Sequence, residues 1–171
     1  MKLLVLALLG MSVWAQAPPT EPSPEHLAAM KKLSWMIGEW RGEAWMQVGP
    51  QKHTSTGTEV VQSRLNGSIL TVEGSFKDAT GKPTHTAFGV LSFNPRSDWY
   101  RFHAFTGAGQ MADAKVAMRD NGFDWSFEAA PGVQVRYRVN LDENGEWVEK
   151  GEMTREGKTV QFFEMRLRKV E

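Results

Sequence analysis

The sequence predicts an all-β domain, a ten-stranded antiparallel up-and-down barrel, and three observations point to it. Glycine is plentiful, at 16 residues, and β-branched and aromatic residues are spread evenly along the chain, as in proteins built from short strands and tight turns. From Glu39 onward, apolar residues alternate with a period of two, and turn signals divide the chain into ten such segments. Connections this short leave no room for crossover helices and favour an antiparallel meander, and closing it into a barrel removes its exposed edges.

The first residues carry a targeting signal that precedes the barrel. A positive charge at Lys2, an apolar run over Leu3–Leu9 and a small residue at Ala15 are typical of a secretory signal peptide. The run is too short to span a bilayer permanently, so we expect an exported protein, periplasmic or secreted, without a membrane span in its mature form. The expected division is a signal peptide at 1–15, a Pro-rich linker at 16–24 and one barrel domain at 25–171.

A short N-terminal helix is expected to cap one mouth of the barrel. Ser23 is a suitable N-cap, and Pro24 fits the first helical position. Apolar residues then recur at steps of three or four up to Ile37. Gly38 is expected to end this helix in the left-handed conformation.

The strands follow the helix in chain order. The first begins at Glu39, and the second ends at Asn66-Gly67, the strongest two-residue hairpin signal. The other predicted strands span 56–65, 69–76, 84–93, 99–105, 111–119, 123–129, 133–141, 146–154 and 159–169. Segments such as Phe88–Leu91 are apolar on both faces, so the sequence leaves their inward side open.

The segment Gly38-Glu39-Trp40, at the start of the first strand, resembles the Gly-x-Trp signature of the calycin barrels, which include the lipocalins and the fatty-acid-binding proteins. In that group the tryptophan closes one end of the barrel, and a basic residue of the last strand often lies across its indole ring. The resemblance implies a plug formed by Gly38 and Trp40, with Arg166 or Arg168 over the ring in a cation–π contact.

A longer pattern is similar to that of domain-of-unknown-function family 1579, whose members are often exported bacterial proteins. It consists of Leu33-x-x-Met-Ile-Gly-Glu-Trp-x-Gly42, Leu65–Leu70 and Phe88–Pro95. The nitrobindins, ten-stranded barrels that bind haem through a late histidine, share a similar Gly-x-Trp-x-Gly opening. This chain has no histidine after His103, so the likeness does not extend to their haem ligand.

Composition and motifs exclude several classes of function. Twenty Lys and Arg residues balance twenty Asp and Glu residues, which gives no indication of a nucleic-acid partner. The chain has no cysteine and therefore neither a disulfide nor a thiolate metal site. There is no Gly-x-Ser-x-Gly motif and no closely spaced histidine pair, so we expect neither an enzyme nor a metal protein.

The barrel interior is the remaining candidate site. A small barrel is either filled by side chains or holds one small ligand, and the small residues Gly74, Gly89, Ala112 and Ala114 favour a cavity. We predict a carrier or sensor of a small hydrophobic molecule, with no cofactor. The expected ligand-binding residues are Arg101, His103 and Tyr137 as polar anchors and Trp125 as part of the wall.

Two alternatives stay open, with no protein partner identified. Haem or nitric-oxide binding requires an inward histidine, for which His103 and His85 are the candidates. A non-catalytic scaffold would bind its partners through loops such as Val48–Thr58. Two carboxylates that converge in the lumen could also form an acid–base pair. Its candidates are Glu73, Glu128, Glu149 and Glu164, of which Glu73 and Glu128 are expected to face solvent.

Overall fold

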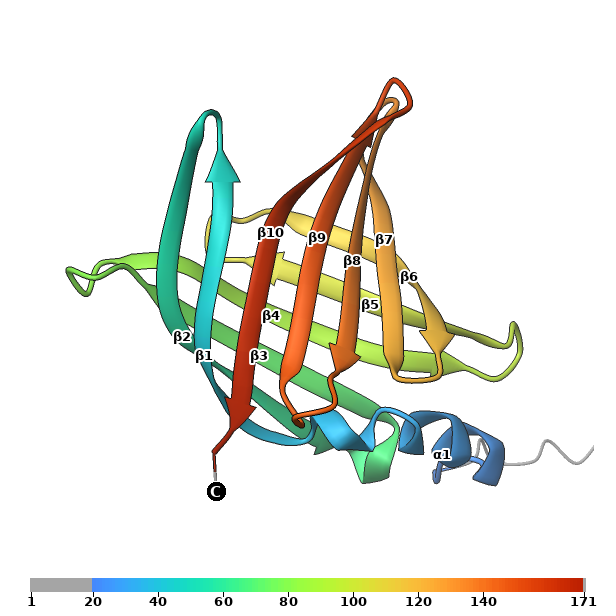
Figure 1. Cartoon of the computed structure of the whole chain (residues 1–171). Helices are drawn as coiled ribbons and strands as arrows, with labels where there is room; N and C mark the ends of the chain where they lie inside the picture. Colours follow the sequence, from blue (N-terminus) through green and yellow to red (C-terminus); the bar gives the residue numbers. More distant parts are fainter. Residues whose placement is uncertain (1–19, 171) are drawn as a thin grey trace, which may run out of the picture.

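The computed structural model describes residues 20–170 and shows a closed barrel of ten antiparallel strands, which confirms the predicted fold class (Figure 1). Each strand pairs with its neighbour in the chain, and the last strand closes the barrel against the first. The strands are β1 Gly38–Val48, β2 Gln51–Arg64, β3 Ile69–Lys77, β4 Pro83–Asn94, β5 Trp99–Thr106, β6 Met111–Arg119, β7 Gly122–Ala130, β8 Val133–Leu141, β9 Trp147–Arg155 and β10 Lys158–Lys169. The expected signal peptide lies outside the described residues.

The strand boundaries agree with the alternation of apolar residues, and β6 and β8 begin and end where the sequence predicts. The largest difference is at β2, which begins at Gln51 rather than Thr56. Its first residues are polar and carry no apolar period, yet they continue the ladder with β1 as far as the pair Val48↔Gln51. The segment Val48–Thr58, expected to be a loop, is therefore mostly a strand.

The N-terminal helix is shorter than expected. Helix α1 spans Pro24–Lys31, and the Ser23 hydroxyl caps it by accepting a hydrogen bond from the backbone N–H of His26 at 3.2 Å. A 3₁₀ turn, η1 Ser34–Met36, follows. Gly38 is not the helix C-cap but the first residue of β1, with φ +134°. The chain leaves the helix early because Leu33 and Met36 turn into the end of the barrel, where both are almost fully buried.

Three tryptophans close the barrel at the end that carries α1. The rings of Trp35, Trp40 and Trp147 meet edge to face in all three pairs, with centroids 5.7–6.2 Å apart, an arrangement favoured by the aromatic quadrupole. The indole N–H of Trp40 donates to the backbone carbonyl of Met36 at 2.7 Å, which satisfies a buried polar group. We call these three residues the tryptophan plug.

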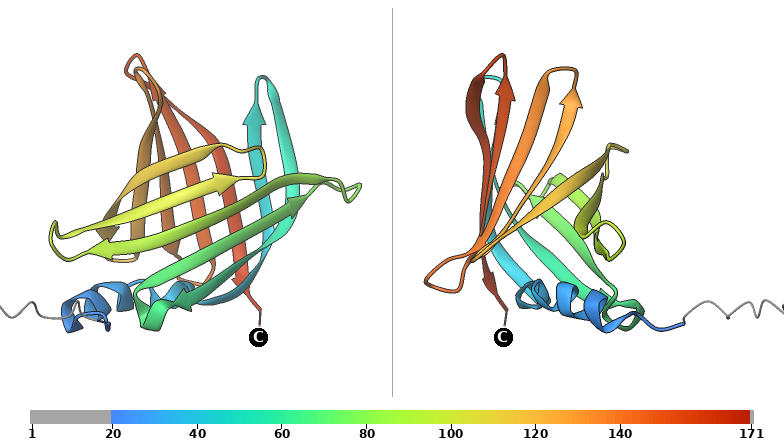
Figure 2. Two further views of the ribbon diagram at one scale, coloured as in Figure 1. Left: turned by 180° about the vertical axis from the view of Figure 1, so that it is seen from behind. Right: turned by 90° about the vertical axis from the view of Figure 1, so that its right-hand side faces the viewer.

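Two hydrogen bonds fasten α1 against this closed end. The Tyr100 hydroxyl donates to the carbonyl of Ala29 at 2.9 Å, and His26 Nε2 lies 2.8 Å from the carbonyl oxygen of Ser68, just after the β2–β3 turn. Figure 2 shows the helix lying across the base of the strands in two further views. This helix is short, and no helix in residues 20–170 has the length and apolar character needed to cross a bilayer.

The opposite end of the barrel is split in two places. Strands β6 and β7 pair only between Lys115↔Ser126 and Arg119↔Gly122, so the first half of β6 has no partner on that side. Strands β1 and β10 pair only as far as Met46↔Phe163. The hairpins therefore diverge beyond these points, as Figures 1 and 2 show.

Candidate ligand-binding cavity

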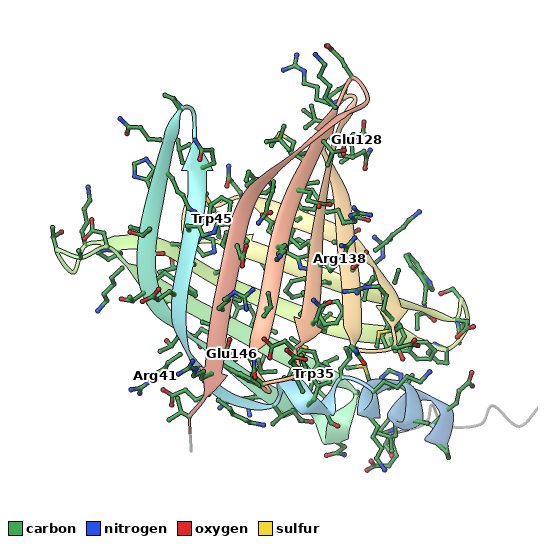
Figure 3. All side chains as sticks on the ribbon, in the orientation of Figure 1. Trp35, Arg41, Trp45, Glu128, Arg138 and Glu146 are labelled. Atoms are coloured by element: carbon green, nitrogen blue, oxygen red, sulfur yellow. The ribbon has the colours of Figure 1, made fainter. Side chains whose placement is uncertain are left out.

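The barrel encloses a cavity of about 990 Å³ between the tryptophan plug and the split end, a size suited to a small organic ligand. Met36 and Trp147 form its floor. Its rim includes Val48 at the β1–β2 hairpin and Glu128 near the β7–β8 hairpin. In Figure 3, Trp35 lies at the closed end beside α1 and Glu128 at the far end of the barrel. The cavity is closed at the floor and open at the rim.

Aromatic side chains form one wall of the cavity. Trp125 and Tyr137 are paired across β7 and β8, and their rings stack with centroids 4.0 Å apart and planes 8° from parallel. Phe102 meets Trp125 edge to face at 5.1 Å, and Phe163 meets Tyr137 at 5.7 Å. This wall brings together side chains from β5, β7, β8 and β10 and presents aromatic surface to the lumen.

Two glycines that were expected to open the cavity instead make room for larger side chains. A Cβ on Gly89 would lie 2.2 Å from Cε2 of Phe102, and one on Gly74 would lie 2.5 Å from Oε1 of Glu59. Ala114 is fully buried. Of the four small residues named from the sequence, Gly89 and Ala112 line the cavity.

Two glutamates reach the cavity just above the plug. Glu59, on β2, lies directly across the ladder from Trp40, and Glu149, on β9, is two residues beyond Trp147. Their side chains are among the most buried polar groups of the described chain, at 9% and 8% exposure. Glu149 accepts a hydrogen bond from the indole N–H of Trp125 at 3.1 Å, whereas Glu59 forms no hydrogen bond or ion pair within residues 20–170.

Burial controls the ionisation of both carboxyls. Removal from water raises the pKa of Glu59 to about 8, and the nearby charge of Glu149 adds to this effect. Burial also raises the pKa of Glu149 to about 7, and the indole N–H groups of Trp125 and Trp147 oppose that rise. Only the Trp125 contact has hydrogen-bond geometry, and Trp147 Nε1 has no partner in the described chain. Without a ligand at pH 7, Glu59 is therefore mostly protonated, and Glu149 is protonated in about half of the molecules.

Histidines reach the cavity near its rim. His53 and His85 lie on its lining, and burial lowers the pKa of His85. The other titratable groups of the rim are Asp78, Lys82 and Glu128. Among residues 20–170, no three metal-binding side chains gather closely enough to hold a metal ion.

The structure places the four predicted ligand-binding residues on opposite sides of the sheet. Trp125 and Tyr137 line the cavity, and their role in binding stays a prediction. Arg101 and His103 lie on the outer surface, where Nη1 of Arg101 is 2.5 Å and Nε2 of His103 is 3.3 Å from Oδ1 of Asp113. Their placement in the lumen was wrong because β5 turns its even-numbered residues inward. Trp99, Tyr100, Phe102 and Phe105 make both of its faces aromatic.

The expected plug is present, but with a different basic residue. Lys169, not an arginine, lies over Trp40, with Nζ 5.3 Å from the ring centroid. Arg166 and Arg168 face outward and bind Glu146, Arg168 through a contact of 2.7 Å. The position of Gly38 requires a glycine, because a Cβ there would lie 2.8 Å from Cε of Lys169.

Glu59 is the site residue that the sequence did not reveal. It stands in Thr58-Glu59-Val60-Val61, where two successive valines hide the alternation. Glu149 was among the strand carboxylates considered, and Glu73 and Glu128 are exposed as expected. Glu59 lies two residues from both Gly57 and Val61, so the three residues share one face of the strand. This spacing indicates that Glu59 points inward only once Val61 is known to do so.

No protein-family model matches the sequence, and no curated protein matches it. Among solved structures, the crystal structure of Rv2717c from M. tuberculosis is similar, with a TM-score of 0.61 and 16% sequence identity. The match covers 84% of this chain and 98% of that chain. At this identity the likeness shows the fold alone, and the resemblance to family 1579 and the calycins stays a prediction.

Proposed function

We propose that this chain is an exported, non-catalytic carrier or sensor that holds a small, mainly apolar molecule in the lumen of its barrel. The observation that carries the proposal is the cavity of about 990 Å³, closed by the tryptophan plug and open at the other end. The proposed export is supported by the sequence of residues 1–15. The proposal requires no cofactor.

Several features of the cavity support the binding of an apolar ligand. Trp125, Tyr137 and Phe102 supply rigid aromatic surface, which binds apolar molecules with little loss of conformational entropy. Near the rim, β6 is not paired with β7 and β1 is not paired with β10. A ligand can therefore enter at these two splits without breaking hydrogen bonds between strands. Few polar groups reach the interior, as in binding sites where contact area supplies affinity and a few anchors supply orientation.

An uncharged fluorescent probe, N-phenyl-1-naphthylamine, tests the proposal directly. Its emission rises when it enters an apolar cavity, so wild-type protein is expected to enhance it in a saturable way. Ala112→Trp places an indole in the cavity and is expected to reduce this binding by about tenfold or more, as bulk replaces ligand volume. The matched control is Ala117→Trp, on the exposed face of the same strand, which should bind as wild type does.

The possible outcomes separate the alternatives. Probe binding that is absent, or equal in the two tryptophan variants, would overturn the carrier proposal and leave the barrel as a scaffold. Haem binding is tested by adding haem to the protein and recording its Soret absorption band. A shift of this band that His85→Ala abolishes would identify haem as the ligand instead. His85 is chosen because it is the one of the two candidate histidines, His85 and His103, that lines the cavity.

A further inference from the structure

We propose that the ligand is an amphiphile with a cationic nitrogen, whose charged head lies against Glu59 and Glu149 at the cavity floor while its apolar part extends toward the rim. This inference rests on the proposed function and names the class of ligand for the same cavity. It is carried by the geometry of two buried carboxyls, the surroundings that leave them uncompensated, and the aromatic wall beside them.

Neither carboxyl has a cationic partner within the described protein. The ladder neighbours of Glu59 are Trp40 on β1 and Gly74 on β3. Those of Glu149 are Val139 on β8 and Met165 on β10. None of these neighbours titrates or carries a charge. A buried carboxyl without a partner is costly to the fold, and a ligand that supplies a positive charge would remove that cost.

Glu59 in particular is more than nine-tenths buried, unpartnered and open to the cavity. Gly74 gives it this position, because any Cβ there would collide with its carboxylate oxygen. The Oε1 atom of Glu149 accepts a hydrogen bond from Trp125, and its Oε2 atom has no hydrogen bond within residues 20–170. The two groups are close enough for the charge of one to affect the ionisation of the other. One ligand head could therefore interact with both.

The aromatic wall suits the same ligand. The stacked rings of Trp125 and Tyr137 lie beside Glu149, as the Trp125 hydrogen bond shows. The face of such rings attracts a cation, and the attraction is stronger when the cation is desolvated. An anionic head would find no cationic side chain at the cavity floor. The lining contains no arginine, and its lysine, Lys82, is at the rim.

Binding of such a ligand would depend on pH, because the carboxyls must lose protons to pair with it. The titratable groups that face the cavity are Glu59, Glu149, Tyr137, His53, Asp78, Lys82, His85 and Glu128. Only the first three belong to the lower part of the barrel, and burial raises the pKa of Tyr137 beyond the physiological range. The affinity for an amine is therefore expected to rise by about tenfold per pH unit below pH 7, where one carboxyl proton is released on binding.

The test compares three ten-carbon probes in the displacement of N-phenyl-1-naphthylamine at pH 8: decylamine, decanol and decanoate, each below the concentration at which it forms micelles. Decylamine is expected to bind about tenfold more tightly than decanol, a difference of about 1.4 kcal/mol, because only the amine can pair with an ionised carboxyl. Decanoate is expected to bind more weakly than either, because its charge has the same sign as that of the two glutamates. In Glu59→Gln and Glu149→Gln, the ratio of amine to alcohol affinity should fall by about tenfold. Glu73→Gln, on the outer face of adjacent β3, is the matched control and should keep the wild-type ratio.

An amine affinity no higher than that of decanol, a preference for decanoate, or a wild-type ratio in both glutamine variants would overturn the inference. Each variant is first checked for its far-ultraviolet circular dichroism and for displacement by decanol, so that misfolding is recognised. If the uncharged probe binds and Ala112→Trp blocks it, but the amine is not preferred, the carrier proposal stands and this inference fails. If no probe binds, both fail.

Discussion

Replacing Glu59 by glutamine is expected to stabilise the ligand-free barrel at alkaline pH while changing its stability little at acid pH. In the folded protein, burial raises the pKa of Glu59 from its ordinary value of 4.5 to about 8. Between these two values the folded chain keeps a proton that the unfolded chain has lost. The free energy of unfolding therefore falls as the pH rises through this window, and the loss is complete above about pH 8.

The size of the effect follows from the same two pKa values. Their difference corresponds to a ceiling of about 5 kcal/mol, at about 1.4 kcal/mol for each pH unit. Part of this arises from the charge of Glu149, and water in the open cavity reduces the desolvation of Glu59. We therefore expect Glu59→Gln to be more stable than wild type by about 2–4 kcal/mol at pH 9, and within about 1 kcal/mol of it at pH 4.

Urea unfolding of the ligand-free proteins at pH 4, 7 and 9 measures this difference in stability. The slope of the free energy of unfolding against urea concentration should be the same in both proteins, because it reports the surface exposed on unfolding. Glu149 titrates in both proteins, so only the part of its contribution that depends on the charge of Glu59 remains in the comparison. Glu73→Gln should follow the wild-type pH profile, because Glu73 is exposed. A Glu59→Gln profile parallel to that of wild type across the whole range would refute the assignment of a buried, uncompensated carboxyl.

Three further predictions concern the frame around the cavity. Trp40→Ala removes a side chain that is 1% exposed and should lower the free energy of unfolding by about 3–5 kcal/mol, measured by urea titration; an unchanged midpoint would contradict the plug. Tyr100→Phe removes the hydroxyl bond to Ala29 and should cost about 1 kcal/mol, with proteolysis near α1 becoming faster; equal cleavage rates would exclude this fastening. In hydrogen exchange, Met111–Ala114, which pair with β5 alone, should lose protection sooner than Lys115 and Val116, which pair with both β5 and β7; the reverse order would contradict the split.

The barrel was predictable because most of its strands have one apolar and one polar face. In β8, for example, alternate residues point to the lumen, namely Val135, Tyr137 and Val139. The period of two predicts this shared face without knowledge of any partner strand. The turn residues between strands fixed the strand number. The closed topology then followed from edge protection and short connections, both of which are local properties of the chain.

The site was harder to predict because it depends on which face of each strand points inward. Strand β5 is aromatic on both faces, so Arg101 and His103 were assigned to the wrong side. The same problem affected the last strand: Lys169 shares the inward phase of Met165 and Leu167, whereas the two arginines lie between them. Phase is set by contacts between distant strands, which a single sequence does not display.

Buried charge was also difficult to recognise. Acidic residues are usually exposed, and a glutamate in a strand is first taken for a solvent-facing residue. Glu59 departs from that rule because Gly74, on the neighbouring strand, leaves the space its carboxyl occupies. Such a pairing of a large polar residue with a glycine across a ladder is visible only when the register is known.

The most direct test of a lumen that holds an amine is a nuclear magnetic resonance titration of the carboxyl carbons with decylamine at pH 7. Binding at the cavity floor should move the Glu59 and Glu149 resonances to their ionised positions and shift the indole N–H of Trp125, while Glu73 stays unchanged. Movement confined to exposed carboxyls, with Glu59 and Glu149 still protonated at saturating amine, would contradict it.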